Sequence, residues 1–262
     1  MRKFIISGRE LQGIIYVNEK QYVKDICNIY KLPKEQIDSV YGFINRYAPL
    51  YGGRVWGKAD KGLSIEKILA LNYNQIAFGL AISNSFFEER AYFKTKRVIE
   101  KMPNHDLNYV IIANDELSMR VRKDFPNLKQ KMSCIQEVDS LDGIYDKLSL
   151  YDEITLHVDQ NLRAGFISSI PEDLKSKVIL FGIGQCATFC KNKICYTGVS
   201  LKNLKKENKG YSCIKKVESS PNKPPSNVPF HISFDLSDSM FDGFNKIKLP
   251  SIAKNMCKLL GK

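Results

Sequence analysis

Residues 76–113 read IAFGLAISNSFFEERAYFKTKRVIEKMPNHDLNYVIIA, and this stretch decides the fold. It begins with the continuous apolar run Ile76 to Ile82, which is typical of a strand buried on both faces. An amphipathic segment over residues 86–102 follows and stops at Pro103-Asn104, as a helix with its C-terminal signal does. The β-branched run Tyr109 to Ala113 then predicts a second strand. A strand, a helix and a strand in this order predict a parallel sheet.

The same alternation continues on both sides of this stretch. We expect further strands at residues 39–44, 131–135, 153–158, 178–184, 230–234 and 244–249, and helices at residues 65–71, 115–125, 141–150, 167–174 and 252–260. Together with the first two strands this predicts an α/β fold, a (β/α)8 TIM-like barrel, as a single domain over residues 1–262. Residues 1–38 are expected to be an N-terminal extension. Residues 198–229, which are rich in lysine and contain four prolines, are expected to be an irregular insertion before the last two strands.

The composition is that of an ordinary globular protein, with 44% hydrophobic and 26% charged residues. The apolar stretch after Met1-Arg2-Lys3 is too short for a signal peptide, and no run approaches the roughly 20 apolar residues of a membrane span. We therefore expect a cytoplasmic protein without a membrane partner. The net charge of +12 favours a polyanionic partner such as RNA, although a lysine-, asparagine- and isoleucine-rich composition also arises from an AT-biased genome.

A cysteine cluster is the strongest chemical signal. Cys186, Cys190 and Cys195 follow the expected strand at 178–184, and Cys213 lies eighteen residues further on. Thiols that converge in one loop usually hold a metal or an iron–sulfur cluster, and an odd number of cysteines without an export signal argues against disulfides. The spacing differs from the Cys-x2-Cys of structural zinc sites. It predicts a [4Fe–4S] cluster on these four cysteines, with zinc as the lesser alternative and no metal as the third. Cys27, Cys134 and Cys257 are expected to be small buried hydrophobic residues.

Several short segments share their order with one known family. They are Gly52-Gly53-Arg54, Gly79-Leu80-Ala81-Ile82-Ser83-Asn84, Ile111-Ile112-Ala113-Asn114-Asp115-Glu116-Leu117, Asp159 at a strand end, Gly184-Gln185-Cys186-x3-Cys190, and Gly243-Phe244-Asn245-Lys246-Ile247-Lys248. In this order they resemble the U32 peptidase-like TIM-barrel proteins, especially their shorter relatives. Four features depart from the family pattern: Gly184 or a neighbour stands where asparagine is usual, Lys191 replaces a proline, Cys195-Tyr196 stands near the usual His-Tyr, and Pro250-Ser251 replaces a Gly-Arg.

The resemblance implies more than one activity. The family name implies proteolysis, whereas several of its members resemble iron–sulfur proteins that support oxygen-independent hydroxylation of RNA bases or of a quinone precursor. The sequence has three histidines and neither a His-Glu-x-x-His nor a Gly-x-Ser-x-Gly segment. We therefore expect an iron–sulfur enzyme that modifies, for example hydroxylates, RNA or a small molecule. A non-catalytic metal- or nucleic-acid-binding protein is the alternative, and a peptidase is the third.

Polar residues at the expected strand ends supply the candidate catalytic groups. Asp159 is a candidate general base or cation ligand, and Arg54 is a candidate ligand for an anionic substrate. Asn84, Asn114 and Ser133 also follow strands, but residues of these types often form turns or helix caps instead. His157 is expected to be a hydrogen-bonded core residue. Lys191, Lys193, Lys205 and Lys206 lie in a lysine-rich segment with interleaved tyrosines, which predicts either an RNA-binding surface or a solvated loop.

Overall fold

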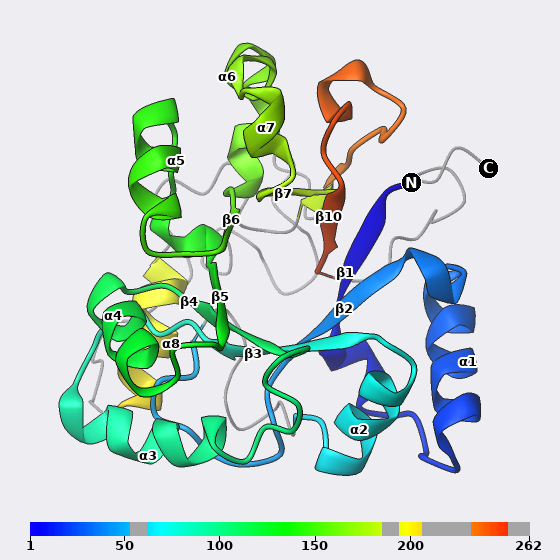
Figure 1. Ribbon diagram of the computed structural model, residues 1–262, viewed down its shortest axis with the longest axis vertical. Coiled ribbons are helices and arrows are strands. Elements are labelled where there is room, and N and C mark those ends of the chain that lie inside the picture. Colours follow the sequence, from blue (N-terminus) through cyan, green and yellow to red (C-terminus); the bar gives the residue numbers. More distant parts are fainter. Residues whose placement is uncertain (53–61, 185–193, 206–231, 251–262) are drawn as a thin grey trace, which may run out of the picture.

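The computed structural model describes residues 1–52, 62–184, 194–205 and 232–250. Eight parallel strands close into a barrel in the order β1, β10, β7, β6, β5, β4, β3, β2 (Figure 1). They are β1 Lys3–Ser7, β2 Ile37–Gly42, β3 Ala77–Ile82, β4 Tyr109–Ile112, β5 Lys129–Met132, β6 Glu153–Thr155, β7 Val178–Phe181 and β10 Lys246–Leu249. The predicted (β/α)8 barrel is confirmed.

Helices alternate with the strands and surround the barrel (Figure 1). The α-helices are α1 Glu19–Tyr30, α2 Ile65–Tyr73, α3 Glu89–Ile99, α4 Asp115–Asp124, α5 Leu141–Leu148, α6 Ala164–Ser169, α7 Glu172–Lys175 and α8 Ile194–Asn203. Short 3-10 helices occupy η1 Gly8–Leu11, η2 Lys34–Gln36, η3 Cys134–Gln136, η4 Val158–Leu162 and η5 Ser239–Phe241. The expected helix at residues 167–174 is divided into α6 and α7 at Pro171, which has no backbone N–H for a continuous helix.

The first strand of the barrel is not the one predicted. Residues 1–38 are not an extension, because β1 pairs with β2 on one side and with β10 on the other. The prediction was wrong because Phe4-Ile5-Ile6 is a very short apolar run beside basic residues. Its partner Ile247 is distant in the chain, so no local pattern reveals the pairing.

The expected barrel strand at 230–234 is also wrong. Within the described part of this range, residues 232–234, the extended residues are those of β9 Ile232–Ser233, which pairs antiparallel with β8 Ile183–Gly184 outside the barrel. The barrel has no place for it, because β10 pairs directly with β7. The expected irregular region 198–229 begins inside α8, since residues 198–203 are helical. Residues 206–229, and the expected helix at 252–260, lie outside the described residues.

The outer faces of the strands form the main core. Val40, Phe78, Val110, Leu180 and Ile247 are fully buried between the barrel and its helices. Burying a side chain of this size contributes about 1.5–3 kcal/mol relative to exposure. The helices add their own apolar faces, and several begin at a side-chain cap, for example Asn18 for α1 and Ser64 for α2. This shell holds the strand ends in place.

The inside of the barrel is partly polar. Tyr109 lies across it and exchanges a hydrogen bond of 2.8 Å with the Ser39 hydroxyl. Near the first residues of the strands, Lys131 Nζ lies 3.0 Å from a Glu153 carboxylate oxygen and 3.8 Å from one of Asp38. The ammonium group of Lys246 also contacts Glu153. This end of the barrel is therefore filled by paired charges, and the opposite end is left to hold a cavity.

Candidate active site at the barrel mouth

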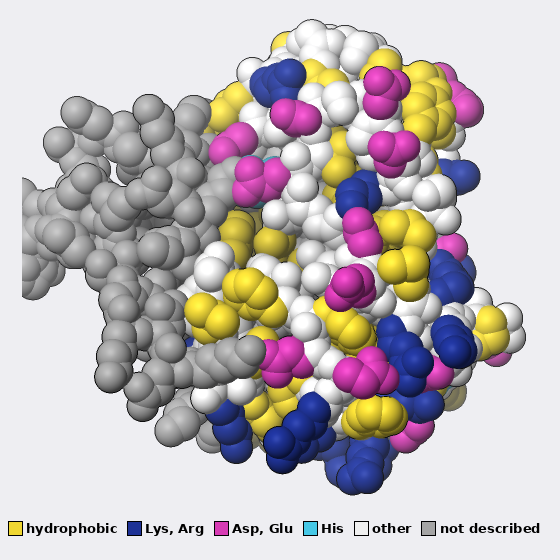
Figure 2. Space-filling view, turned by 90° about the vertical axis from the view of Figure 1, so that its left-hand side faces the viewer, with side chains coloured by type: hydrophobic (Ala, Val, Ile, Leu, Met, Phe, Trp, Pro, Cys, Tyr) yellow, Lys and Arg dark blue, Asp and Glu magenta, His cyan; other side chains and the backbone are white. Residues whose placement is uncertain are grey.

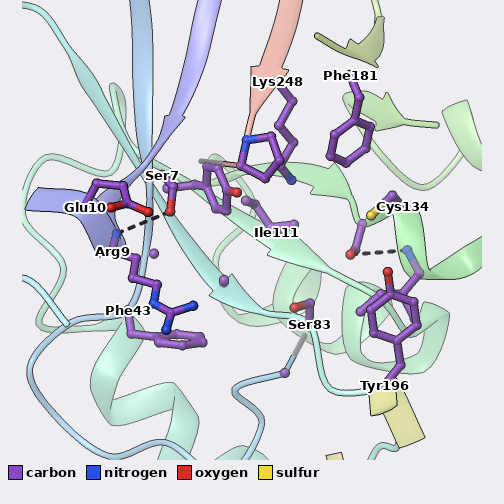
Figure 3. Close-up of a pocket in the computed structure, with 17 residues that line it drawn as sticks. Ser7, Arg9, Glu10, Phe43, Ser83, Ile111, Cys134, Phe181, Tyr196 and Lys248 are labelled. Carbon is purple, nitrogen blue, oxygen red and sulfur yellow. Dashed lines mark hydrogen bonds between the residues drawn. The ribbon is translucent and has the colours of Figure 1, made fainter. Parts of the chain in front are cut away.

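A cavity of about 190 Å³ opens at the carboxyl ends of the strands (Figure 3). This is the end at which the active sites of TIM barrels lie. Six of the eight barrel strands contribute to its lining within their own bounds, namely Ser7 of β1, Tyr41 and Gly42 of β2, Ala81 of β3, Ile111 of β4, Phe181 of β7 and Lys248 of β10. Loops and short helices supply the rest: Arg9, Glu10, Phe43, Gly52, Ser83, Ser133, Cys134, Ile135, Tyr196 and Pro250.

Lys248 is the most unusual residue of this cavity. Ile247 and Leu249 are fully buried on the helix side of β10, so strand alternation turns Lys248 into the barrel. Its ammonium nitrogen lies 4.4 Å from the centre of the Tyr41 ring and 5.8 Å from that of Phe181. Desolvation by these surroundings lowers the pKa of Lys248. The lowered pKa increases the fraction of the deprotonated, nucleophilic amine relative to an exposed lysine.

Two titratable neighbours, Cys134 and Lys131, also act on the pKa of Lys248. The field of Cys134 raises the pKa of Lys248, and the field of Lys131 lowers it. Cys134 itself is half-buried at the start of η3, where its predecessor Ser133 caps the helix by accepting a hydrogen bond of 3.5 Å from the Ile135 N–H. Cys134 was expected to be a small buried core residue; it is half-buried and packs against the core, and it also lines the cavity.

A second cation lies on the other side of the cavity. Ser7 ends β1 and caps η1 by accepting a hydrogen bond of 3.3 Å from the Arg9 N–H. In Figure 3 the Arg9 guanidinium lies beside the Phe43 ring, and that ring stacks on Tyr51 with centroids 4.4 Å apart. Among the described residues that line the cavity, Arg9 and Lys248 face a single carboxylate, that of Glu10. The cavity therefore has a surplus of positive charge suited to an anion.

Asn84 lies beneath the cavity rather than in its lining. Its side chain is fully buried, and its Nδ2 donates to the carbonyl oxygens of Pro49, Tyr51 and Ser200 at 3.2, 3.4 and 3.0 Å. Its Oδ1 accepts a hydrogen bond of 2.9 Å from the Phe86 N–H. These bonds tie the loop after β2 and the helix α8 to the end of β3. The residue predicted as catalytic makes the bonds of a structural turn residue.

Asn114 likewise makes the bonds of a helix cap. Its Oδ1 accepts a hydrogen bond of 3.0 Å from the Leu117 N–H at the start of α4, and its Nδ2 donates to the Ser85 carbonyl at 3.4 Å. It is not among the residues that line the cavity. Asn114 thus makes the contacts of a helix cap, which the sequence offered as the alternative to a catalytic role.

Asp159 lies at the mouth but outside the cavity lining. It belongs to η4, and one of its carboxylate oxygens lies 3.4 Å from Nδ1 of His157. The same Nδ1 accepts a hydrogen bond of 3.3 Å from the Asp159 N–H. His157 is buried, as expected of a hydrogen-bonded core histidine. Neither residue lines the cavity that contains Lys248.

Three of the four predicted cluster ligands lie outside the described residues, namely Cys186, Cys190 and Cys213. The predicted anion ligand Arg54 and three lysines of the predicted RNA surface, Lys191, Lys193 and Lys206, also lie outside them. Cys195 lies in α8, but its side chain is not described. Within the described ranges no group of three or more His, Cys, Asp or Glu side chains is arranged to hold a metal. The described lysine of the predicted RNA surface, Lys205, lies 5.7 Å from the centre of the Tyr47 ring.

Sequence analysis did not single out Lys248, although the sequence of its strand contains one signal for it. In Lys246-Ile247-Lys248-Leu249, the two lysines share one face of the strand, and in a barrel strand the face opposite the apolar one points inward. Cys134 and Arg9 carry no such signal, because they enter the cavity through the short helices that follow β5 and β1.

Among the comparisons with known proteins, the structural comparison gives a match and the two sequence comparisons give none. No family model matches the sequence, and no curated protein matches it. A solved structure described as that of the U32 peptidase Mk0906 superposes with a TM-score of 0.58, over 97% of this chain and 94% of that chain. This chain has the fold of that U32 peptidase. The U32-like fold expected from the sequence segments is thus confirmed, whereas 10% identity carries no activity from one protein to the other.

The U32-like barrel described here has no helix long and apolar enough to cross a membrane, within the residues that the structure describes.

Proposed function

We propose that the protein is an enzyme that modifies a small anionic molecule in the cavity at the barrel mouth. The observation that carries this proposal is the cavity itself, which contains a buried lysine and a second cation against one carboxylate. An enclosed site with a few converging polar groups is the usual form of a small-molecule site. Its place at the carboxyl ends of the strands is where this fold performs chemistry.

We further propose that Cys186, Cys190, Cys195 and Cys213 hold a [4Fe–4S] cluster beside this cavity. Two residues that flank the first three cysteines support the location. Phe181 precedes Cys186, Tyr196 directly follows Cys195, and both Phe181 and Tyr196 line the cavity. Thiolates are the donors that such clusters use, so the donor chemistry fits. When bound, the cluster would supply single electrons to a modification such as hydroxylation. The cavity residues would bind and orient the substrate.

The substrate proposal predicts that a small carboxylate binds in the cavity. Pyruvate should bind to the full chain in a calorimetric titration, and Arg9→Ala should weaken the affinity by about tenfold or more, since a charged hydrogen bond to a ligand contributes on the order of 1.5–3 kcal/mol. Lys123→Ala is the matched control, because Lys123 is an exposed cation on α4 that does not line the cavity. Equal affinity of the parent and Arg9→Ala would remove the anion site from this cavity.

The cofactor proposal predicts iron and sulfide. Protein purified without oxygen should be brown, should absorb near roughly 400 nm, and should contain about four iron and four sulfide atoms per chain. The Cys186→Ala and Cys190→Ala variants should lose most of this iron. Cys27→Ala is the matched control, because Cys27 lies half-buried on α1, away from the barrel mouth. A colourless protein that contains zinc would favour the lesser alternative, and one without any metal would end the cluster proposal.

RNA modification is the second candidate function. A separate cleft is lined by Tyr47, Arg90, Lys94 and Lys205, among others, and combines an exposed aromatic ring with three cations. Figure 2 shows Lys and Arg side chains gathered at the lower edge of one face, at the level of α3 in Figure 1. Contacts of this kind with phosphates would make RNA affinity fall steeply with salt. Affinity that is insensitive to salt would leave only the small-molecule substrate.

The peptidase hypothesis rests on the description of the similar solved structure as a U32 peptidase. The cavity offers one feature in its favour, since a lysine amine can act as general base for a serine or cysteine nucleophile. Cys134 and Ser133 share the cavity with Lys248. Hydrolysis of peptides by the metal-free protein, lost in Lys248→Met, would replace the modification proposal.

A further inference from the structure

Two lysines are buried inside the barrel, and they differ in their partners. Lys131 lies between Glu153 and Asp38, at 3.0 and 3.8 Å from their carboxylate oxygens. Lys248 is also buried, with 7% of its surface exposed, but none of the described carboxylates lies within ion-pair distance of its nitrogen. A buried ammonium without a carboxylate is costly, so an unpaired lysine in a cavity marks a functional position more than a structural one.

The contacts of Lys248 are mostly aromatic. The Tyr41 ring lies against its nitrogen at 4.4 Å, and Phe181 lies further away at 5.8 Å. Aromatic faces stabilise an ammonium ion less than a carboxylate does, and they exclude water. Desolvation accordingly lowers the pKa of Lys248, which increases the fraction of neutral amine. A lysine in this situation is a nucleophile for carbonyl carbon.

We propose that Lys248 is the nucleophile of the mouth cavity and forms an imine with a small α-keto acid. The inference rests on the proposed function, because it assigns a substrate class to the same anion-binding cavity. The lone pair of the amine attacks the keto carbon and forms the carbon–nitrogen bond. The two protons of the neutral amine then leave with the keto oxygen as water, so the step needs no oxidant or reductant.

The choice of a keto acid follows from the second cation, and an α-keto acid is the smallest molecule of this class. Arg9 lines the same cavity as Lys248, and a guanidinium binds a carboxylate through two parallel hydrogen bonds. A ligand with one carboxylate and one carbonyl group would satisfy Arg9 and Lys248 together. The cavity of about 190 Å³ has room for such a small molecule.

Borohydride trapping tests the imine directly. The full-length protein is incubated with pyruvate, reduced with sodium borohydride, digested, and mapped by mass spectrometry. We expect the reduced adduct, which has the mass of pyruvate less one oxygen atom, to accumulate on Lys248 at pyruvate concentrations that leave other lysines unmodified. Lys246, two residues earlier on β10 and paired with Glu153, is the internal control in the same peptide map.

Two variants separate the imine from the binding site. Lys248→Arg keeps a cation that can bind pyruvate but cannot form an imine, so it should bind in the calorimetric titration and give no adduct. Lys248→Met should give no adduct either, with circular dichroism to show that it is folded. Pyruvate binding without an adduct on the parent's Lys248 would overturn the imine and leave the anion site intact. The absence of both binding and adduct would overturn the anion site as well.

Discussion

At the scale of single residues, the barrel interior depends on one glycine. Tyr109 crosses the barrel to reach Ser39, and its ring passes directly over Gly79 on the neighbouring strand. A Cβ atom at residue 79 would lie 2.5 Å from two carbon atoms of that ring. The ring is fully buried and cannot move away easily. Gly79 therefore allows the aromatic layer beneath the mouth cavity to form.

Gly79→Ala is accordingly expected to destabilise the protein by about 1–3 kcal/mol, as overpacking of a filled core does. Urea unfolding followed by circular dichroism measures this as a lower midpoint. Gly165→Ala is the matched control, because Gly165 lies in α6 and a Cβ there meets no atom within 4 Å. That control should be unchanged or more stable by up to about 1 kcal/mol. A Gly79→Ala protein with the parent's midpoint would show that the Tyr109 ring is not confined.

At the scale of elements, local sequence pattern was sufficient for the two central strands that lie on either side of one helix. The predicted strands at residues 76–82 and 109–113 correspond to β3 and β4, each within one residue. Local sequence pattern failed to predict strands that pair with a strand far away in the chain. β1 was missed because its partner strand β10 closes the barrel from the far end of the chain, and residues 230–234 were over-interpreted because apolar composition does not distinguish a barrel strand from the short β8–β9 pair.

The same distinction applies to the candidate site. The location at the carboxyl ends of the strands follows from the fold class, and Ser133 does line the cavity. Asn84 and Asn114 have the right location but the contacts of a turn and a helix cap, because an amide at a strand end satisfies backbone groups at least as readily as it binds a ligand. Lys248 was missed because its burial comes from Tyr41 and Phe181 on other strands, which only the folded barrel brings together.

At the scale of the whole molecule, closure of the barrel holds the mouth cavity together. β1 is the strand that closes it, since it pairs with β10 through Lys3 to Ile6 and with β2 through Phe4 to Ser7. Its side chains are buried on both faces, with Phe4, Ile5 and Ile6 at most 2% exposed. Ser7 and Arg9, at the end of this strand and just after it, also line the cavity. Fold and site thus depend on the same few N-terminal residues.

Deletion of residues 1–7 is therefore expected to abolish cooperative unfolding, because it leaves β2 and β10 each with one unpaired edge and opens the core between them. Circular dichroism during urea unfolding is the measurement.

The milder variant Ile6→Ala should lower the free energy of unfolding by about 2–5 kcal/mol. Ile15→Ser is the matched control in the same part of the chain, since Ile15 is 81% exposed and its replacement should change stability by less than about 0.5 kcal/mol. If the shortened chain unfolded at the parent's midpoint, residues 1–7 would be dispensable and an N-terminal extension would describe them after all.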